Sequence, residues 1–408
     1  MQPVELGPIG PEEQTSTPLD LFLIFVGANV VATTLQVGAS LPTSFTLGTA
    51  LGVIAAGAVA GALLTAALAP VGSRLRVPSI VASRAALGSG GAQALAGILF
   101  VTNFAWIALN NVIAASITAQ VTGIGSTGVW SVGLGLAATL IVLGGPRVAA
   151  IVDRVAVPLL MLSGAVFTVA VLRAPAPQWP VGPVAVGDIT RGLDIVIGYQ
   201  ASWLLMFADY PRFVRSPRQA GIAVFLGLAL TSLWFMPLGL VASAVAGSSD
   251  PGAMVTALNL GVWGALLVAV AALTTNFVNI YMSALALKSL RPTLSGAAGV
   301  WLIGGIGAAL GLFSMGWLER FASFTLILAS LLVPIGGLLL AHFFVLRSAT
   351  DVAALYTPRT GLAAWSAPGL AAWVTGAVVF HLASAIGGTL PSLLATIVVY
   401  VVLTARRT

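Results

Sequence analysis

The chain has 408 residues, of which 59% are hydrophobic and only 7% are charged, with a mean hydropathy of +1.06. Ordinary globular proteins carry charge on about a quarter of their residues, so this composition excludes a water-soluble protein. The net charge of +6 comes from basic residues scattered singly, which excludes a nucleic-acid-binding patch, and the absence of Cys excludes disulfides and thiolate metal sites.

Apolar runs of about 20 residues predict an all-α integral membrane protein. Breaks rich in charge, Pro or Gly divide the chain into twelve candidate spans. The last two of them are also compatible with a single hairpin. In chain order, the spans cover residues 20–42, 45–70, 92–121, 128–146, 152–173, 191–208, 219–246, 260–288, 296–315, 320–346, 368–387 and 389–405.

Basic residues predict the orientation of these spans. If the N-terminus is cytoplasmic, 14 of the 17 Lys and Arg residues fall in loops on the inside, and only Arg173, Arg191 and Arg320 fall outside. Such a bias is typical of cytoplasmic loops. We therefore expect a multi-pass protein of the cell (inner or plasma) membrane, with twelve spans and both termini cytoplasmic. The inside residues are Arg74, Arg76, Arg84, Arg147, Arg154, Arg212, Arg215, Arg218, Lys288, Arg291, Arg347, Arg359, Arg406 and Arg407.

Acidic residues lie in loops or near span ends along the whole sequence. A carboxylate at the bilayer midplane would indicate a proton relay or a cationic substrate. The middle of the spans instead offers amides, hydroxyls and aromatic rings. This pattern favours a neutral substrate that forms hydrogen bonds.

Polar side chains gather at mid-depth in the first, third, sixth and eighth spans. Asn103, Trp106 and Asn110 share one helical stripe, and so do Asn276 and Asn279. A single amide or hydroxyl in a membrane helix more often holds two helices together than binds a ligand. The recurrence in four spans favours a site, because unpaired amides in hydrocarbon cost several kcal/mol. The predicted substrate-binding residues are Asn29, Thr33, Asn103, Trp106, Asn110, Tyr199, Gln200, Trp203, Asn276 and Asn279.

The polar spans also indicate an internal repeat. Spans 1 and 6, and spans 3 and 8, are each five apart, as expected for two five-helix repeats of inverted topology with broken helices at corresponding positions. We expect the breaks in spans 1 and 6 at Gly27 and Gly198. A break exposes carbonyl oxygens that can hold a cation, and the adjacent hydroxyls of Thr274 and Thr275 are suited to complete a sodium shell. The predicted units are a cytoplasmic tail (1–19), a first repeat (20–173), a second repeat (174–346), and a loop with two C-terminal helices (347–408).

Several segments, in their order along the chain, are similar to one transporter family. Residues 19–29 read LDLFLIFVGAN, Arg84 stands four residues before Gly88, and residues 208–213 read ADYPRF. Thr-Thr-Asn at 274–276 is followed by Tyr281. Over residues 10–290 these motifs resemble the nucleobase–cation symporter family of cytosine and purine permeases. The third motif corresponds to that family's Ala-Asp-aromatic-x-Arg-aromatic loop.

The resemblance implies a LeuT-type fold, five plus five inverted helices with helices 1 and 6 broken, and two further C-terminal helices. It implies that Trp106 stacks on the substrate ring, that Asn103 stands at an amide position, and that Asn276 binds the ring edge. Gln200 departs from the family, which has an aromatic residue there, so Tyr199 or Trp203 is expected to supply the second face. The implied sodium ligands are carbonyls of Gly27, Val30 and Ala271 and the hydroxyls of Thr274 and Thr275.

The sequence therefore predicts a secondary active transporter that imports a nucleobase or related small heterocycle by sodium symport. Alternatives within the family are an importer of a vitamin precursor (hydroxymethylpyrimidine or a thiamine-like compound), of a hydantoin or allantoin, or a proton-coupled carrier. A passive channel is the alternative from another class. No catalytic constellation indicates an enzyme. We expect no cofactor, sodium as the coupling ion, the heterocycle and the lipid bilayer as partners, no nucleic acid, and a monomer.

Overall fold

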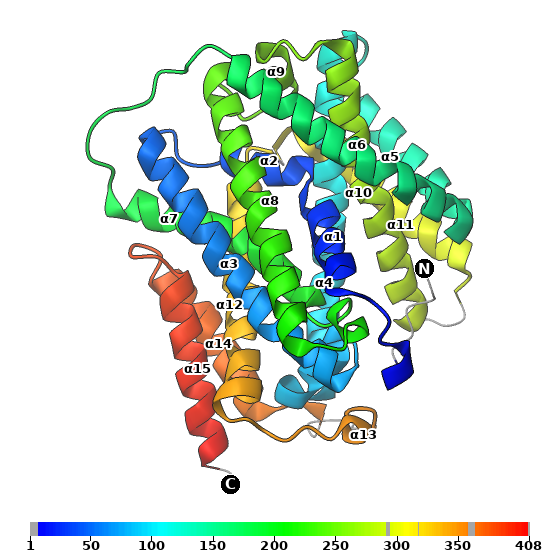
Figure 1. The fold of residues 1–408 in the computed structure, drawn as a ribbon, viewed down its shortest axis with the longest axis vertical. Helices are drawn as coiled ribbons and strands as arrows, with labels where there is room; N and C mark the ends of the chain where they lie inside the picture. Colours follow the sequence, from blue (N-terminus) through cyan, green and yellow to red (C-terminus); the bar gives the residue numbers. More distant parts are fainter. Residues whose placement is uncertain (1–6, 291–293, 317, 358–363, 407–408) are drawn as a thin grey trace.

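The computed structural model describes residues 7–290, 294–316, 318–357 and 364–406, and every regular element in these residues is a helix (Figure 1). The helices of the first half are α1 (Pro18–Asn29), α2 (Ala32–Ala39), α3 (Leu47–Leu75), α4 (Ser79–Thr122), α5 (Thr127–Leu143), α6 (Gly145–Arg173) and α7 (Val186–Ala201). Those of the second half are α8 (Pro217–Ala246), α9 (Pro251–Ala257), α10 (Gly261–Leu290), α11 (Gly296–Leu310), α12 (Phe321–Leu340), α13 (Val352–Leu355), α14 (Ala367–Leu382) and α15 (Thr389–Ala405). Short 3-10 turns and one π-helical turn (Ala341–Val345) complete the elements.

Each of the twelve predicted spans overlaps a helix, and the all-helical membrane class is confirmed. Within the described residues, five helices are long and apolar enough to cross a membrane, or six if α1 and α2 form one bent span. Four shorter apolar helices add to these: Thr127–Leu143, Pro158–Arg173, Ala367–Leu382 and Thr389–Ala405. The number of crossings therefore stays a prediction, and the short helices α9 and α13 were not expected.

A sharp bend interrupts the first predicted span. Helix α1 ends at Asn29 and α2 begins at Ala32, with 58° between the two helices. Val30 and Val31 leave the helical region, with Val31 fully extended at φ −135 and ψ 160. Adjacent β-branched residues favour such a change, because their side chains fit an extended backbone better than a helix.

The predicted break positions at Gly27 and Gly198 are wrong, since both residues lie inside regular helices, α1 and α7. Gly198 serves a different purpose. A Cβ atom at this position would collide with the backbone carbonyl of Thr325 on α12, so the glycine allows α7 and α12 to approach closely. Helix α7 gives way to a 3-10 turn only at Ser202.

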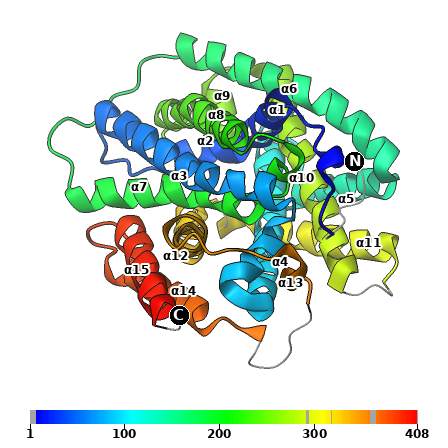
Figure 2. The ribbon, with the colours of Figure 1, turned by 60° about the horizontal axis from the view of Figure 1, so that its bottom comes forward.

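The helices form three packed groups. Helices α1, α2 and α3 pack on α8, and α7 packs on α3, as one bundle. Helices α4, α5, α10 and α11 pack as a second, with α6 against α10 and α8. Helices α14 and α15 pack on α12, on the side of the molecule away from α5 and α6, as two views agree (Figures 1 and 2). Helix α12 also contacts α7, so it connects the C-terminal pair to the first bundle.

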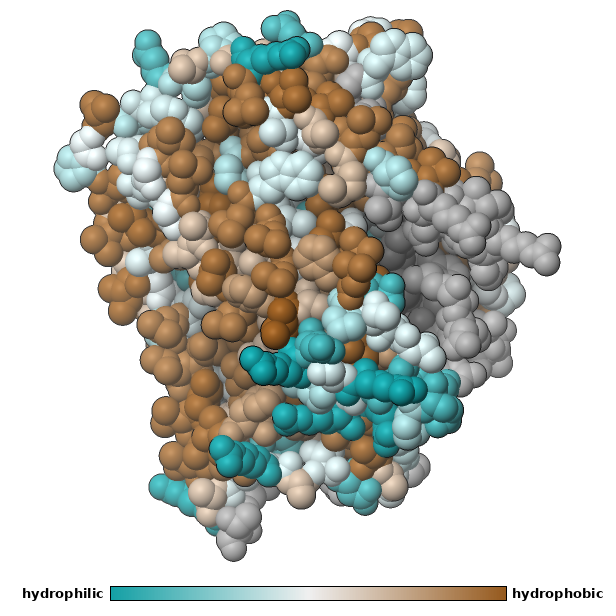
Figure 3. Space-filling model, in the orientation of Figure 1, coloured by the Kyte–Doolittle hydropathy of each residue, from teal (hydrophilic) through white to brown (hydrophobic). Residues whose placement is uncertain are grey.

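The segment before α1, residues 7–17, crosses one end of the molecule. We call this end, with the α3–α4 turn and the α7–α8 loop, the tail face. The Ile9 amide donates to the Arg76 carbonyl at 3.0 Å, and the Ser16 amide donates to the Phe213 carbonyl at 3.1 Å. The tail therefore contacts the turn between α3 and α4 and the loop between α7 and α8. Figure 3 shows hydrophobic residues over the middle of the visible surface and hydrophilic residues gathered towards the tail face.

The Arg84 and Gly88 motif holds a loop on this face. The guanidinium of Arg84 donates to the Leu355 carbonyl at 2.9 Å and lies 6.0 Å from the centroid of the Tyr356 ring. Gly88 kinks α4 with φ 76, a conformation that glycine adopts without strain. A Cβ atom there would collide with the Ala364 carbonyl. The motif therefore secures the segment that leads from α12 to α14.

Candidate functional site

Trp106, on α4, stands among three aromatic rings from two other helices. Its centroid lies 5.8 Å from that of Tyr199 on α7, and 5.0 Å and 6.4 Å from those of Phe324 and Phe321 on α12. All three pairs are edge-to-face, an arrangement that stabilises aromatic clusters beyond the area they bury. The Trp106 side chain stays partly accessible. The cluster thus places a partly accessible indole among three rings at the junction of the first bundle, the second bundle and α12.

The hydroxyl of Tyr199 connects this cluster to the bend between α1 and α2. Its oxygen lies 2.6 Å from Thr34 Oγ1, and Thr34 Oγ1 donates to the backbone carbonyl of Asn29 at 2.6 Å. A carbonyl only accepts, so the Thr34 proton is used there and Tyr199 is the donor to Thr34. Tyr199 is 3% exposed and Thr34 is fully buried. A directed chain of two hydrogen bonds therefore runs from the aromatic cluster to the last residue of α1.

Asn103 and Asn276 are engaged between α4 and α10. Asn103 Nδ2 donates to Ser283 Oγ at 2.9 Å, and Asn276 Nδ2 donates to the Ile107 carbonyl at 3.1 Å and to Asn111 Oδ1. Among the described residues, no hydrogen-bond partner lies near the buried Asn276 Oδ1. The predicted stripe of Asn103 and Trp106 therefore divides, because Asn103 points to α10 while Trp106 points to α7 and α12.

Asn29 and Gln200 meet inside the first bundle. Asn29 Nδ2 donates to Thr231 Oγ1 at 2.7 Å and to Ser232 Oγ at 2.8 Å, and Gln200 Nε2 donates to the same Ser232 Oγ at 2.7 Å. Gly61 on α3 leaves room for the Gln200 side chain, since a Cβ atom there would collide with it. The structure therefore brings these two amides to α8, and it does not bring them to Trp106. Gln200 Oε1 is buried and has no hydrogen-bond partner within the described ranges.

The remaining predicted substrate-binding residues lie at separate positions around these contacts. Trp203 lies edge-on to Phe25 of α1, with 5.8 Å between centroids, so Tyr199 and not Trp203 shares the cluster of Trp106. Thr33 is buried at the start of α2. Asn110 is buried on α4, and its Oδ1 has no partner in the part of the chain that the structure describes. Asn279 is partly buried on α10.

The predicted cation ligands lie on α1 and α10. Gly27 is in the last turn of α1, and Val30 directly follows the end of that helix. Thr275 is partly buried in α10, which packs against α2. The side chains of Ala271 and Thr274 lie outside the described part of the chain. The ligand set stays a prediction.

Three residues that contribute to this arrangement were not among those predicted. Phe321 and Phe324 complete the aromatic cluster, and their i, i+3 spacing on span 10 was the signal available in the sequence. Asn111 pairs with Asn276, and its position beside Asn110 was the corresponding signal.

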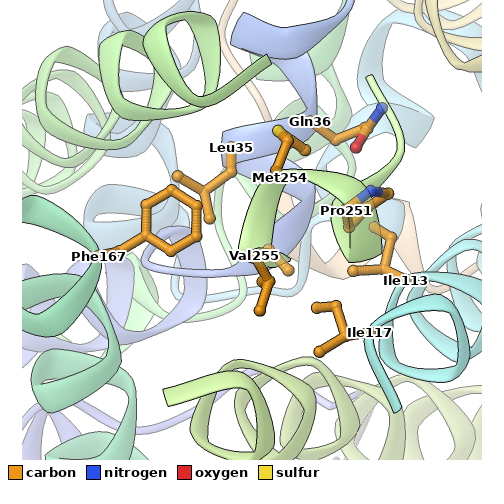
Figure 4. A pocket seen from close by; sticks show the side chains of 9 residues that line it. Leu35, Gln36, Ile113, Ile117, Phe167, Pro251, Met254 and Val255 are labelled. Carbon is orange, nitrogen blue, oxygen red and sulfur yellow. The ribbon is translucent and has the colours of Figure 1, made fainter. Parts of the chain in front are cut away.

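A small hollow lies beside α2 (Figure 4). Its walls are apolar side chains of α2, α4, α6 and α9, including Leu35, Ile113, Phe167 and Val255, with Gln36 as the polar member. Gln36 Nε2 donates to the Ser249 carbonyl at 3.0 Å, and its Oε1 is buried without a partner. The lining includes neither Trp106 nor Tyr199, so the hollow is separate from the aromatic cluster.

Asp209 and Arg212 lie at the tail face, in the loop between α7 and α8. Burial raises the pKa of the Asp209 carboxyl, against hydrogen bonds from the hydroxyl and amide of Ser79 and the positive charge of Arg212. Ser79 is the first residue of α4, so Asp209 joins the α7–α8 loop to the start of α4. The Arg212 guanidinium, 4% exposed, lies 4.8 Å from the centroid of the Phe213 ring.

Comparison with known proteins gives consistent matches over most of the chain. The sequence model of the family described as "Permease for cytosine/purines, uracil, thiamine, allantoin" matches residues 8–402. YxlA of Bacillus subtilis (strain 168), whose name describes it as a purine-cytosine permease, is 24% identical over 363 residues, which cover 82% of this chain and 78% of YxlA.

Two solved structures have a similar fold. One is Mhp1, a nucleobase-cation-symport-1 family transporter, in a closed conformation with bromovinylhydantoin bound, with a TM-score of 0.77 and 19% identity over 98% of this chain and 94% of that chain. The inward-facing conformation of Mhp1 gives a TM-score of 0.81 and 18% identity, over 98% and 93% of the two chains.

Proposed function

The chain belongs to the family of permeases for cytosine and purines, uracil, thiamine and allantoin, and on that premise we propose that it imports a nucleobase or related flat heterocycle by sodium symport. The observation that carries this proposal is the aromatic cluster around Trp106, connected through Tyr199 and Thr34 to the bend between α1 and α2. A partly accessible indole suits stacking on a heterocyclic ring, and a helix bend suits a cation.

In this proposal Trp106 stacks on the ring of the substrate, and Tyr199 and Phe324 border the same space. Base–aromatic stacking contributes about 1–3 kcal/mol for each ring and tolerates different heterocycles. Asn110, with its buried acceptor Oδ1 unpartnered, is suited to select a ring edge that carries an N–H donor. Asn276 Oδ1 offers a second acceptor of the same kind. Selectivity then depends on the amides and affinity on the rings.

The proposed sodium ligands are carbonyls of Gly27, Val30 and Ala271 with the hydroxyls of Thr274 and Thr275. Neutral oxygens suffice for sodium, and the carbonyl end of α1 contributes partial negative charge. Ion and substrate together must favour the closed state over the open one for symport to occur. We further propose twelve spans in five-plus-five inverted repeats with both termini cytoplasmic. The basic residues Arg76, Arg212 and Arg215 on the tail face support this orientation.

Uptake by the full-length protein in liposomes tests the proposal. Radiolabelled cytosine, uracil, hypoxanthine, hydantoin and hydroxymethylpyrimidine are supplied with an inward sodium gradient, with a pH gradient, or with neither. Accumulation of one of them above equilibrium with sodium alone supports the proposal. Accumulation with the pH gradient alone means proton coupling, equilibration without accumulation means a passive channel, and no uptake of any probe overturns the substrate class.

A further inference from the structure

Thr34 occupies a position that connects two parts of the proposed mechanism. It lies in the first turn of α2, three residues after Val31, and is fully buried. Through one oxygen atom it donates to the Asn29 carbonyl and accepts from Tyr199, both at 2.6 Å. Helix ends leave backbone carbonyls without intrahelical partners. Thr34 therefore satisfies a carbonyl that the bend exposes, and does so from across the bend.

The far end of this chain of hydrogen bonds is the ring surface. Tyr199 meets Trp106 edge-on, with 5.8 Å between centroids at an interplanar angle of 82°. Its hydroxyl is engaged with Thr34, so the position of the Tyr199 ring depends on the position of the peptide at Asn29. Hydrogen bonds in series strengthen one another in a low-dielectric interior. The peptide at Asn29 and the ring of Tyr199 therefore cannot shift independently without breaking a buried hydrogen bond.

We propose that Thr34 is a positioning residue which couples cation occupancy at the α1–α2 bend to the shape of the aromatic surface around Trp106. This inference rests on the proposed function. A cation held by carbonyls at the bend would fix the backbone of Asn29 and Val30. The two hydrogen bonds would then fix Tyr199, and the ring would meet a surface that is already ordered. By linkage, substrate binding would raise cation affinity by the same factor, about 5- to 150-fold for typical couplings.

Two variants remove the connection while keeping the shape of the site. Thr34→Val replaces the hydroxyl by a methyl group of similar size. Tyr199→Phe keeps the ring against Trp106 and removes the hydroxyl, including any contribution from Thr33, which also lies within reach of it. Thr118→Val is the matched control. Thr118 is a buried threonine of α4 whose hydroxyl donates only to the Ala114 carbonyl of its own helix, at 2.7 Å.

The test is hydrogen–deuterium exchange of the full-length protein in sodium chloride and in choline chloride, without substrate. Peptides covering residues 24–36 report the bend, and peptides covering residues 190–201 report α7, which contributes none of the proposed sodium ligands. In the wild type and in Thr118→Val, sodium should slow exchange in both segments. In Thr34→Val and in Tyr199→Phe, sodium should still protect the bend, while its protection of α7 is lost.

The outcomes separate this inference from the proposed function. If sodium protects neither segment in the wild type, the sodium assignment fails and the coupling role of Thr34 fails with it. If sodium protects the bend and leaves α7 unchanged, or if Tyr199→Phe retains protection of α7, the role of Thr34 alone is overturned. Should Thr34→Val not fold, Tyr199→Phe decides the question, because it removes the same hydrogen bond from the other side.

Discussion

The side-chain amide of Gln14 donates a 3.0 Å hydrogen bond to the backbone carbonyl of Arg212, although 198 residues separate the two in sequence. The same nitrogen lies 2.9 Å from the Ser73 carbonyl and 3.4 Å from the Val214 carbonyl. Arg215 Nε returns a 3.0 Å bond to the Gln14 carbonyl. One buried amide thus joins the tail to the last turn of α3 and to the α7–α8 loop, immediately before α1.

Gln14→Glu should release the tail, because a carboxylate would face three carbonyl oxygens without a proton to donate. Gln14→Ala should have a smaller effect, since it only removes the bonds, at about 0.5–1.5 kcal/mol for each. Exchange rates of peptides covering residues 7–17, and the melting temperature, measure both effects. The exposed Glu12→Gln variant is the control. Equal behaviour of Gln14→Glu and wild type would show that the tail is held by other contacts.

Trp106→Ala should reduce substrate affinity by about 1–3 kcal/mol, the value of one stacking face, and leave the protein folded. Trp106→Phe should retain part of the affinity. Trp203→Phe is the matched comparison, since that ring lies against Phe25 in the first bundle and should leave affinity unchanged. Equilibrium binding of the heterocycle identified by the uptake screen gives the result. Unchanged affinity in Trp106→Ala would remove this residue from the site.

Asn276→Ala should lower both stability and selectivity. It leaves the Ile107 carbonyl and Asn111 without their partner, at about 1–3 kcal/mol for a buried polar group. If Asn276 Oδ1 also binds the ring edge, discrimination against analogues that lack the matching N–H should flatten. Asn111→Ala should lower stability and leave selectivity intact. Melting temperatures and competition binding separate the two roles. A uniform loss of affinity for all ligands would mean that Asn276 only holds α4 and α10 together.

Asp194→Ala should loosen the two C-terminal helices. The Asp194 carboxylate, 4% exposed on α7, accepts from the Gly388 amide at 2.7 Å and from the Thr389 amide at 3.0 Å, where α15 begins. Hydrogen bonds to a charged group contribute about 1.5–3 kcal/mol. Faster exchange in residues 383–392 would report the loss, with Asp351→Ala as a control at the short helix α13. Unchanged exchange would mean that packing on α12 alone holds α15.

The all-helical class and the place of Trp106 within a long helix were accessible from the sequence, because apolar length and helical periodicity depend on neighbouring residues. The division between Asn103 and Trp106 was not. Two side chains three positions apart in a helix point about 300° apart around its axis, which is 60° in the other direction. Residues of one stripe can therefore face two different neighbouring helices. In this structure Asn103 faces α10 and Trp106 faces α7 and α12.

The position of the bend and the partners of the amides also depend on tertiary contacts that the local sequence does not indicate. Glycine marks both flexible breaks and close helix contacts, and only the tertiary position of Thr325 shows that Gly198 belongs to the second kind. The amide of Gln200 reaches Ser232 because α7 and α8 both pack against α3. The partners of Gln14 are 59 to 200 residues away, so no local pattern indicates them.

The stability of the protein should depend on the protonation of Asp209. Burial raises the pKa of this carboxyl from 3.8, so the folded state binds a proton more readily than the unfolded state does. Stability contributed by this group therefore increases as the pH falls through the folded-state pKa, and the increase is complete below 3.8.

Asp209→Asn removes the titration while keeping an oxygen that accepts from Ser79. The wild type should thus gain melting temperature relative to Asp209→Asn as the pH is lowered from 7.5 towards 3.8. Ser79→Ala, which removes one bond to the ionised carboxylate, should move this gain to higher pH. A wild type that instead loses stability relative to Asp209→Asn on acidification would show that Arg212 and Ser79 outweigh burial and lower the pKa of Asp209.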